Sequence, residues 1–570
     1  MIYLPEQKPV AERSITISAF GGYRHDHRAG ADRFFDMLNL SSDAFPLLTN
    51  RKPRKIAAKV SGNANGLCAK DALLWVDGTT LYYDGQPVGE LLDTPKQMAG
   101  MGSKVVIWPD KVAYDTETGE LTELGAHYVS SDKVSMTICT LDGADIDAPA
   151  SDTAPAGSGG AYWIDTGETP HVLKRYSANN GRWTSIPTSY IKITAVGVGA
   201  LIKSGDGVTI RGAVADVANG SFVVQDAGDD YIMIIGLLDE SVEQSESIIV
   251  ERNIPDMDYI CEHNNRIWGC SSASHEIRCC KLGDPTNWEC FQGISTDSYV
   301  LTVGSDGDFT GACAYGGNVI FFKENKIIKI MGAVPAKFAL SPVECNGVAT
   351  GSAASLVVAN ETLFYLSTAG ICAYNGALPT LIGEDLAGPY SNAVAGATPT
   401  KYYVSMMAAD GIWHLFVYDT LRGLWHREDS LHAAGFARLG AQLYVLDAAT
   451  NQLMAIDAPE AEDEKPVPWM FETGELIVDT RYGYPKKLII RFEKPWTYDP
   501  GRDPIASIRY DDGPFEQISY FTAHRKQIIE IPIRLRRCDS LALRISGYGD
   551  FKLHSYSLVY AEGSGHGIGC

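Results

Sequence analysis

Short hairpin units recur along most of this chain, and their spacing restricts the fold more than any other feature of the sequence. Each unit reads strand, turn, strand, turn, strand, with Val, Ile, Tyr, Phe and Trp in the strands and Gly, Asn or Asp in the turns. Examples are "ALLWVDGTTLYYDG" (72–85) and "IWHLFVYDTLRGLWHRED" (412–429). The units are spaced roughly 30 to 45 residues apart, the repeat length of β-propeller blades. The sequence therefore predicts an all-β protein built on a multi-bladed β-propeller of about six to eight blades.

Within several units, bulky apolar residues stand seven positions apart across a polar turn. The pairs are Tyr114 with Leu121, Tyr176 with Trp183, Tyr418 with Trp425, and Leu446 with Leu453, and an Asp follows the first member at Asp115, Asp419 and Asp447. We expect this step to return the second side chain to the same sheet face, where blades pack. We expect the Asp to accept backbone N–H bonds inside the turn. The alternative is a sandwich of unrelated hairpins, because the units differ strongly in sequence.

Two stretches interrupt the repeat and suggest domain boundaries. Residues 188–255 alternate in short strands with Gly-Asp turns and read as a small β-barrel inserted into a blade, and "EAEDEKPVP" (460–468) reads as an acidic, proline-bearing linker. The predicted organisation is an extended N-terminal arm (1–65), a first propeller part (66–187), the inserted barrel (188–255), a second propeller part (256–458), a linker (459–468), a C-terminal β-sandwich (469–562) and a flexible tail (563–570).

The charge of the chain disfavours tight binding to nucleic acid. Its formal net charge is −22, and its 48 Lys and Arg are scattered rather than gathered into a basic face. The N-terminus lacks the basic start and apolar run of a secretory signal, and no long uninterrupted apolar window spans a membrane. We therefore expect folding in a cytosol and no contact with a membrane.

The sequence contains no convincing metal or catalytic motif. Five of the twelve cysteines lie between Cys261 and Cys290, but no Cys-x-x-Cys pair occurs there, and adjacent Cys279 and Cys280 would point to opposite faces of a strand. No phosphate-binding glycine loop, G-x-S-x-G elbow or H-E-x-x-H pair is present. The acidic runs "LDGADIDAPASD" and "GSDGDFTG" read as turns, and His414 and His426 as structural histidines. We predict no catalytic residue, no metal and no cofactor, and hence a protein that is not an enzyme.

Both ends of the chain resemble a family of virion proteins. The stretches "FGGYRHDHRAGADRFFDMLNLSSDAFPLLTNRKPRKI" (20–56) and "IPIRLRRCDSLALRISGYGDFKLHSYSLVYAEGS" (531–564) look like the opening and the end of virion proteins of tailed bacteriophages. The whole plan of arm, propeller, inserted barrel and final β segment is similar to the propeller-bearing tail nozzle, or packaged-DNA stabilisation (head-closure), proteins of short-tailed phages.

The resemblance implies a structural part of a virion tail or neck, made in the bacterial host cytoplasm. Copies of the chain would form a nozzle-like ring, commonly six-fold in that family, that extends and closes the DNA channel below the portal. The implied partners are other copies, the portal or adaptor, other tail proteins, and packaged DNA that passes without sequence-specific contact. An acidic lumen suits DNA passage and ejection, because each phosphate contact by Lys or Arg would add a salt-sensitive tether.

The N-terminal arm is the predicted contact segment. We expect its apolar residues to pack against the body or the neighbouring subunit, and its basic residues to meet acidic surface, although a solvated basic linker is the alternative. The apolar residues are Phe34, Phe35, Met37, Leu38, Phe45 and Leu47, and the basic ones are Arg51, Lys52, Arg54 and Lys55.

Two other functions remain open from the sequence. The first is a receptor- or carbohydrate-binding tail protein, in which the sandwich presents Trp496, Tyr498 and Tyr548 to sugars. The second is a propeller glycosidase, which would place paired carboxylates and a group of arginines around a central channel. Arginines lie near the predicted blade turns, but the sequence has no repeated S-x-D-x-G-x-x-W box beside them.

Overall fold

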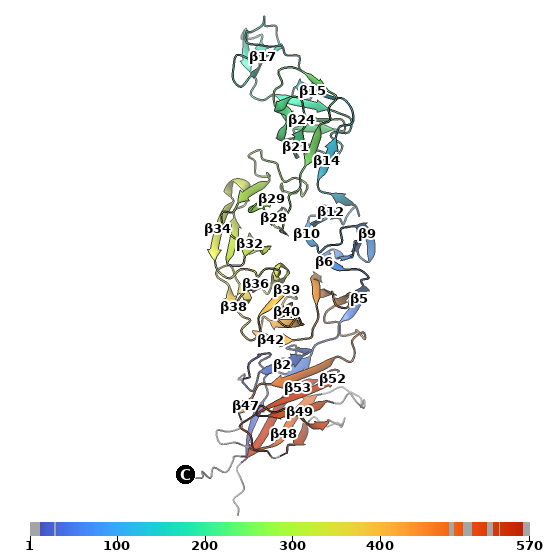
Figure 1. The fold of residues 1–570 in the computed structure, drawn as a ribbon, viewed down its shortest axis with the longest axis vertical. Coiled ribbons are helices and arrows are strands. Elements are labelled where there is room, and N and C mark those ends of the chain that lie inside the picture. The colour runs from blue at the N-terminus through green and yellow to red at the C-terminus, as the bar shows by residue number, and fades with distance from the viewer. Residues whose placement is uncertain are drawn as a thin grey trace, which may run out of the picture. The chain divides into compact units, whose positions relative to one another are not determined.

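Four-stranded antiparallel sheets, most of them formed by strands that are consecutive in sequence, recur along the chain in the computed structural model (Figure 1). The structure describes residues 12–27, 30–477, 484–493, 504–520, 528–534 and 536–561. The chain divides into two compact units. The first comprises Met1–Pro95, Phe322–Ile327 and Val343–Cys570, and the second comprises Lys96–Phe321 and Ile328–Pro342.

The first unit contains four of these sheets. They consist of β6 (Ala64–Lys70), β7 (Ala72–Asp77), β8 (Thr80–Tyr83) and β9 (Gln86–Glu90); β35 (Val357–Ala359), β36 (Thr362–Ser367), β37 (Gly370–Tyr374) and β38 (Thr380–Leu381); β39 (Tyr390–Ala397), β40 (Lys401–Ala408), β41 (Trp413–Asp419) and β42 (Leu424–Arg427); and β43 (Ala433–Leu439), β44 (Gln442–Asp447) and β45 (Gln452–Ala455) with β5 (Lys55–Lys59). A short 3₁₀ turn, η3 (Ala353–Ser355), precedes β35.

Strand β5 closes the last of these sheets from the other end of the sequence. It pairs antiparallel with β45, so that a residue such as Ala58 lies opposite Leu453. A final sheet completed by a strand from before the first blade is typical of propellers, because it leaves no unpaired seam between the ends of the ring.

The first strands of neighbouring sheets approach closely because they carry small residues. Strands β39, β43 and β6 lie next to one another in that order. A Cβ added at Gly396 in β39 would lie 2.4 Å from Cβ of Phe436 in β43, and one added at Gly435 would lie 3.3 Å from Cβ of Leu67 in β6. Glycine at these positions therefore allows the strands to pack against each other.

The second unit contains three further sheets of the same kind. They consist of β10 (Gln97–Met101), β11 (Lys104–Trp108), β12 (Val112–Asp115) and β13 (Leu121–Glu123); β27 (Tyr259–Glu262), β28 (Ile267–Ser271), β29 (Glu276–Cys279) and β30 (Tyr299–Thr302); and, mostly within this unit, β31 (Gly311–Tyr315), β32 (Asn318–Lys323), β33 (Lys326–Met331) and β34 (Ala339–Glu344), with η2 (Pro335–Lys337) before β34. The part of the chain that the structure describes thus has seven such sheets, and the predicted propeller fold is confirmed.

An inserted domain interrupts the second unit between β13 and β27. Its strands are β14 (Ala126–Val129), β15 (Val134–Cys139), β16 (Ala150–Ser151), β17 (Tyr162–Asp165), β18 (Val172–Ser177), β19 (Arg182–Ser185), β20 (Tyr190–Thr194), β21 (Gly207–Arg211), β22 (Gly220–Val223), β23 (Asp226–Gly228), β24 (Tyr231–Ile235), β25 (Val242–Gln244) and β26 (Ile249–Arg252), with η1 (Asp216–Ala218) before β22. The sheets β14-β26-β21-β22 and β23-β24-β20-β15-β25 enclose one apolar core, and together they form the predicted small barrel.

The insertion is larger than the predicted range of 188–255. It begins at Ala126, because β14 pairs with β26 and β15 pairs with β20. The segment 161–186, which the sequence placed in a propeller blade, forms β17–β19 of a small sheet, and its Ile164 and Leu173 join the core of the barrel. The first propeller part therefore does not extend to residue 187. Hairpins of a blade and of a barrel have the same alternating pattern, so the pattern alone did not separate them.

The C-terminal sandwich is built from both ends of the chain. Its strands are β1 (Glu12–Ile17), β2 (Phe34–Leu38), β3 (Leu40–Ser41), β4 (Leu48–Asn50), β46 (Pro468–Thr473), β47 (Leu476–Ile477), β48 (Tyr484–Glu493), β49 (Ile505–Tyr510), β50 (Glu516–Tyr520), β51 (Ile528–Pro532), β52 (Ser540–Tyr548) and β53 (Lys552–Ala561). One sheet has the order β3-β4-β53-β48-β51 with β1 on β53, and the other has the order β2-β46-β52-β49-β50 with β47 on β52.

The segment predicted as a free N-terminal arm is therefore part of the sandwich. Strand β1 pairs with β53, β2 with β46, and β4 with β53. These pairings correct two predicted boundaries, because residues 469–562 do not form the sandwich alone and residues 12–54 are not a separate arm. The predicted flexible tail at 563–570 lies outside the described residues.

Substitution of Gly396 by Ala tests the close approach of β39 and β43. The added methyl group would overlap Cβ of Phe436, which no side-chain rotation can move, so we expect a loss of about 1–3 kcal/mol in the free energy of unfolding. Urea unfolding followed by tryptophan fluorescence measures it. Gly304→Ala, where an added Cβ meets open space, is the matched control and should change stability by less than about 0.5 kcal/mol. Equal effects of the two substitutions would contradict the packing argument.

Candidate functional site

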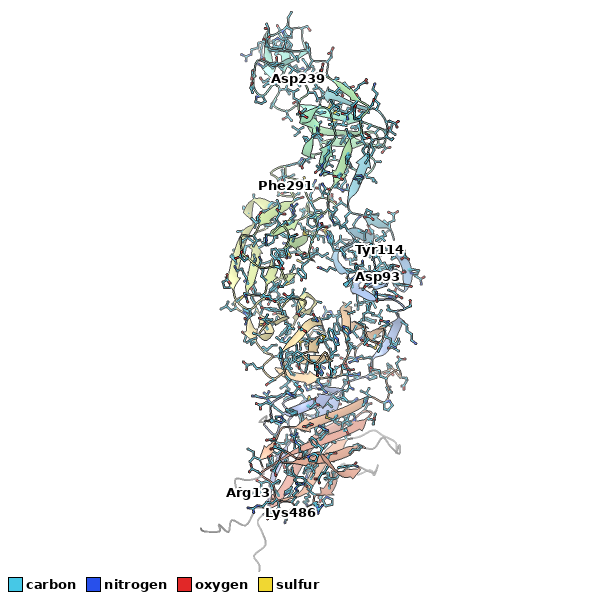
Figure 2. All side chains as sticks on the ribbon, in the orientation of Figure 1. Arg13, Asp93, Tyr114, Asp239, Phe291 and Lys486 are labelled. Carbon is cyan, nitrogen blue, oxygen red and sulfur yellow. The ribbon has the colours of Figure 1, made fainter. Side chains whose placement is uncertain are left out.

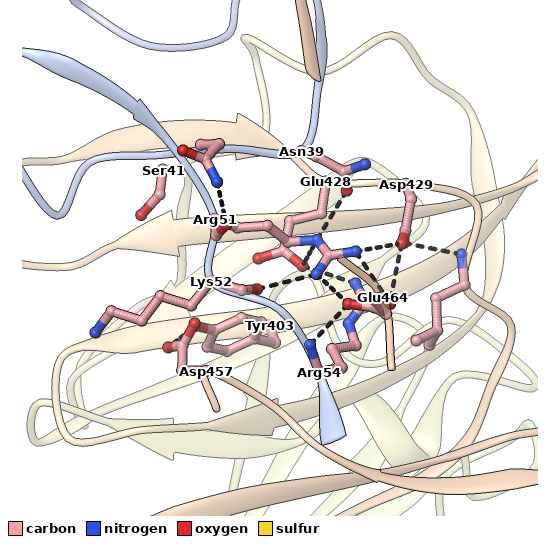
Figure 3. Close-up of polar contacts among 12 residues, drawn as sticks. Asn39, Ser41, Arg51, Lys52, Arg54, Tyr403, Glu428, Asp429, Asp457 and Glu464 are labelled. Carbon is pink, nitrogen blue, oxygen red and sulfur yellow. Dashed lines mark hydrogen bonds and ion pairs between the residues drawn. The ribbon is translucent and has the colours of Figure 1, made fainter. Parts of the chain in front are cut away.

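Two buried arginines of the N-terminal segment meet three carboxylates from distant parts of the chain (Figure 3). Arg51 and Arg54 follow β4, Glu428 and Asp429 follow β42, and Glu464 lies in the segment before β46. We call these five residues the anchor cluster. All of them belong to the first unit.

Arg54 contacts all three carboxylates. Its guanidinium donates to Glu428 at 2.8 Å and to Asp429 at 2.7 Å, and its backbone N–H donates to Glu464 at 2.7 Å. Both Arg54 and Glu428 are buried. Charge-assisted bonds between buried partners fix geometry strongly, because breaking one leaves a charge without solvent.

Arg51 donates hydrogen bonds to two of the same three carboxylates. Its guanidinium donates to Glu464 at 2.7 Å and to Asp429 at 3.3 Å, and its Nε donates to the side chain of Asn39 at 2.8 Å. The segment 459–468, predicted as a linker, is thereby held to the N-terminal segment through Glu464.

The electrostatics of the cluster follow from burial and pairing. Burial alone would raise the pKa of Asp429, but Arg54 and Arg51 lower it to about 2. For Glu428, burial outweighs the same two arginines, and its pKa is raised. Two cations face three carboxylates, so ionisation of one acid is disfavoured, and burial makes that acid Glu428. The bonded guanidinium donors face carboxylates, the side-chain oxygen of Asn39 and the backbone carbonyl of Lys52, so the cluster holds the three segments together.

Further bonds run from the N-terminal segment to strand β42 and its neighbours. The backbone N–H groups of Tyr23 and Asn39 donate to the carbonyls of Trp425 and Glu428 at 2.6 and 2.8 Å. Gly22 has φ of +80°, and an added Cβ would lie 2.5 Å from the Trp425 carbonyl oxygen, so this contact requires glycine.

Three side-chain contacts reinforce this attachment. Asp36 pairs with Arg427 at 2.9 Å, Asp43 pairs with Lys401 at 2.5 Å, and Ser42 donates to Asp419 at 2.6 Å. The N-terminal segment is thus bonded along its length to the sheet β39–β42.

The predicted contact residues of the arm make most of their described contacts with other parts of the same chain. Phe34 and Met37 are fully buried in the core of the first unit, and the ring of Phe34 packs against that of Phe471 with 5.1 Å between the ring centroids. Phe35 stacks between His25 and His27, Leu38 pairs with Met470, and Leu47 is half-buried. Phe45 is 42% exposed beneath Arg422. Lys52 and Lys55 are exposed, in contrast to Arg51 and Arg54.

The residues seven apart lie directly opposite each other on adjacent strands. This holds for Tyr114 and Leu121, Tyr176 and Trp183, Tyr418 and Trp425, and Leu446 and Leu453. Trp425 and both leucines of the last pair are buried, and Trp425 donates to the Ile382 carbonyl at 2.8 Å. The following Asp accepts backbone N–H groups of its turn, as Asp419 does from Leu421 at 3.0 Å. Tyr176 and Trp183 do not lie in a propeller sheet, because they belong to the insertion.

The other candidate functional residues from the sequence concern metal binding, membrane contact and sugar binding. Within the described ranges, no three His, Cys, Asp or Glu side chains come together in a way that could hold a metal ion. None of the described helices is long and apolar enough to cross a membrane. Tyr548 is 44% exposed, whereas Trp496 and Tyr498 lie outside the described residues.

Comparison with known proteins gives only distant structural likenesses. No family model matches the chain, and no curated protein matches its sequence. Among solved structures, the designed Ika8 protein has 11% identity and a TM-score of 0.34, with 71% of this chain and 100% of that chain covered. BamB from Moraxella catarrhalis has 11% identity and a TM-score of 0.30, with 75% and 99% covered. PorZ of Porphyromonas gingivalis has 11% identity and a TM-score of 0.27, with 91% and 81% covered.

Removal of the Arg54 guanidinium tests the anchor cluster. Arg54→Ala leaves Glu428 buried without its closest cation, so we expect a loss of about 3–5 kcal/mol in the free energy of unfolding. Arg24→Ala is the control in the same segment. The Arg24 side chain is 44% exposed, and its ion pairs with Asp385 at 3.6 Å and Asp26 at 3.7 Å would be lost at an expected cost of at most about 1 kcal/mol. Urea unfolding measures both, and equal losses would show that burial of the cluster does not matter.

The pH dependence of stability tests His426, which lies in β42 two residues before Glu428. Burial lowers the pKa of His426 to about 4, so the folded state keeps it neutral while the unfolded chain takes up a proton near pH 6.5. Stability from this group is therefore complete above pH 6.5 and is lost as pH falls toward 4, by about 3 kcal/mol. His426→Gln should flatten the slope of stability against pH in this window, measured by urea unfolding at each pH.

Proposed function

We propose that this chain is a structural component of a bacteriophage tail or neck, which assembles into a nozzle-like ring that extends and closes the DNA channel below the portal. The proposal begins from the resemblance of residues 20–56 and 531–564 to the ends of tailed-phage virion proteins. The order of parts along the chain supports it, since a propeller, an insertion and a terminal sandwich follow the plan of the nozzle proteins that the sequence resembles.

One observation carries the proposal further than the sequence does. The two stretches that resemble virion proteins lie at opposite ends of the chain, yet they form one module in the structure. Strand β53 pairs with both β1 and β4, and β2 joins the opposite sheet through β46. The resemblance to virion proteins therefore concerns one folded module rather than two unrelated segments. This makes it stronger support than either segment alone, because the sandwich needs strands from both.

The distribution of charge supports passage of DNA without adhesion. Residues 55–458 contain 25 Lys and Arg against 47 Asp and Glu, whereas the two terminal segments together contain 23 of each. The propeller and its insertion therefore carry the whole formal charge of −22. Such a surface repels phosphate and offers few salt-sensitive contacts.

Direct observation of assemblies tests the proposal. The purified chain, studied by mass photometry and negative-stain electron microscopy over a range of concentrations, should form closed rings of a single copy number. A uniform monomer at every concentration would overturn the proposed ring. Turnover of fluorogenic glycosides by the monomer would instead favour the glycosidase hypothesis.

Binding to DNA provides a second, independent test. Because the acidic parts repel phosphate, we expect no shift of a duplex in a gel at physiological salt, and at most weak binding, with Kd above about 10⁻⁴ M, at 50 mM salt. Tight, salt-resistant binding would contradict the proposed passive channel.

A further inference from the structure

An apolar groove lies in the second unit, between the insertion and the sheet β27–β30. Its cavity volume is about 610 Å³. Phe291, which Figure 2 labels, lies in the loop between β29 and β30 and forms part of it. The other lining residues are Ser221, Phe222, Val223, Gln225, Ile235, Arg278, Glu289, Gln292 and Val300.

Three large apolar side chains of the groove are exposed. Phe291 is 52% exposed, Ile235 is 50% exposed and Val300 is 36% exposed. Single exposed apolar residues are ordinary on protein surfaces, but several in one concave site with a polar rim are typical of a binding surface.

Polar bonds between the insertion and the loop that follows β29 hold the two walls of the groove together. Asn287, which is fully buried, accepts from the backbone N–H of Gly207 at 3.3 Å and donates to the Gly205 carbonyl at 2.6 Å. Lys203 pairs with Asp284 at 2.8 Å. The insertion and the sheet β27–β30 therefore present a preformed surface, which lowers the entropic cost of binding.

Open strand edges border this surface. Strand β22 ends its sheet, and strand β30 ends the sheet β27–β30, so each has one row of backbone groups without a neighbouring strand in the described structure. Such edges accept an added extended segment, whose side chains then enter the adjacent pocket. The geometry favours a strand as the occupant.

The charge of the groove indicates what that strand carries. The Arg278 guanidinium is bound by Glu276 at 2.9 Å and is thereby neutralised. Glu289 is half-buried in the groove, and no hydrogen bond or ion pair to its carboxylate occurs among the residues that the structure describes. A partly buried carboxylate beside apolar side chains favours an occupant with a cation next to an apolar residue.

The sandwich of the same chain offers such an edge. Strand β51 ends its sheet within the described ranges, and its Ile528 is 49% exposed. Arg491 of β48 lies directly opposite Ile528, so both side chains project from the same face of the sheet. Among the residues that the structure describes, the Arg491 guanidinium bonds to the hydroxyl of Ser557 at 3.5 Å and to no carboxylate.

We propose that the groove of one copy binds the β48–β51 edge of a second copy, with Ile528 against Phe291 and Arg491 paired with Glu289. The two surfaces differ, so the contact is head-to-tail and repeats from copy to copy, which is how identical subunits form a ring. This inference rests on the proposed ring and names the contact that builds it. Both parts of the contact lie in the chain itself, so no other protein is needed for assembly.

Charge reversal tests the pairing. Glu289→Arg and Arg491→Glu should each raise the midpoint concentration of assembly at least about tenfold, because each places like charges together at the contact. The double variant restores opposite charges and should assemble within about threefold of the unmodified chain. An equimolar mixture of the two single variants should also assemble, because alternating copies place opposite charges at every contact, in the original and the swapped orientation by turns. Mass photometry measures each midpoint.

Matched variants separate the contact from general effects. Phe291→Asp should abolish assembly, whereas Leu141→Asp, at a similarly exposed residue outside the groove, should not. Glu246→Arg, at an exposed acid of the insertion away from the groove, controls for the change in net charge. Thermal unfolding by circular dichroism verifies that each variant folds.

The outcomes distinguish this inference from the proposed function. If the unmodified chain forms rings and the groove variants assemble equally well, the groove contact is wrong while the ring stands. If neither the double variant nor the mixture recovers assembly, the pairing of Glu289 with Arg491 is wrong. If the unmodified chain is monomeric throughout, both proposals fail.

Discussion

The buried pairing of Arg51 and Arg54 with Glu428, Asp429 and Glu464 is the constraint on which the first unit depends. The segment with Arg51 and Arg54 meets there two segments more than 370 residues later in the sequence, and breaking the pairs would leave the buried charges of Arg54 and Glu428 without solvent. The cluster holds the N-terminal segment on the sheet β39–β42 and fixes the start of the chain into the sandwich. The closure of the last propeller sheet by β5 follows directly after Arg54, so the two features support each other.

This arrangement changes which surfaces are available to partners. The apolar side chains of the N-terminal segment, above all Phe34 and Met37, are used in the core of their own chain. Among the exposed apolar side chains, Phe291, Ile235 and Val300 line one groove of the second unit, and Ile528 lies on an open strand edge of the first. The proposed assembly therefore uses rigid, preformed surfaces rather than a free arm, which reduces the entropy lost when copies associate.

Local patterns were readable from the sequence and long-range ones were not. The seven-residue step at Tyr418 and Trp425 predicts a hairpin because both partners lie within one short segment, and the Asp of the turn adds a second local signal. The start of the insertion at Ala126 depends on pairing with Ile249–Arg252, more than a hundred residues away, and no local residue marks it. The groove at Phe291 could not be predicted from the sequence either, because a single aromatic residue in a loop forms no periodic pattern.

The all-β class, the repeating hairpins and the acidic balance can be read from the sequence alone, because strand alternation, turn residues and charge are properties of neighbouring residues. The three-dimensional fold was needed to show that the two ends of the chain share one sandwich and that Arg51 and Arg54 are buried while Lys52 and Lys55 are not. It was also needed to show that Glu289 lies in an apolar groove without a partner among the described residues. The reason is physical: burial and ion pairing depend on which distant segments meet, and alternating β segments can satisfy their backbone bonds with many different partners.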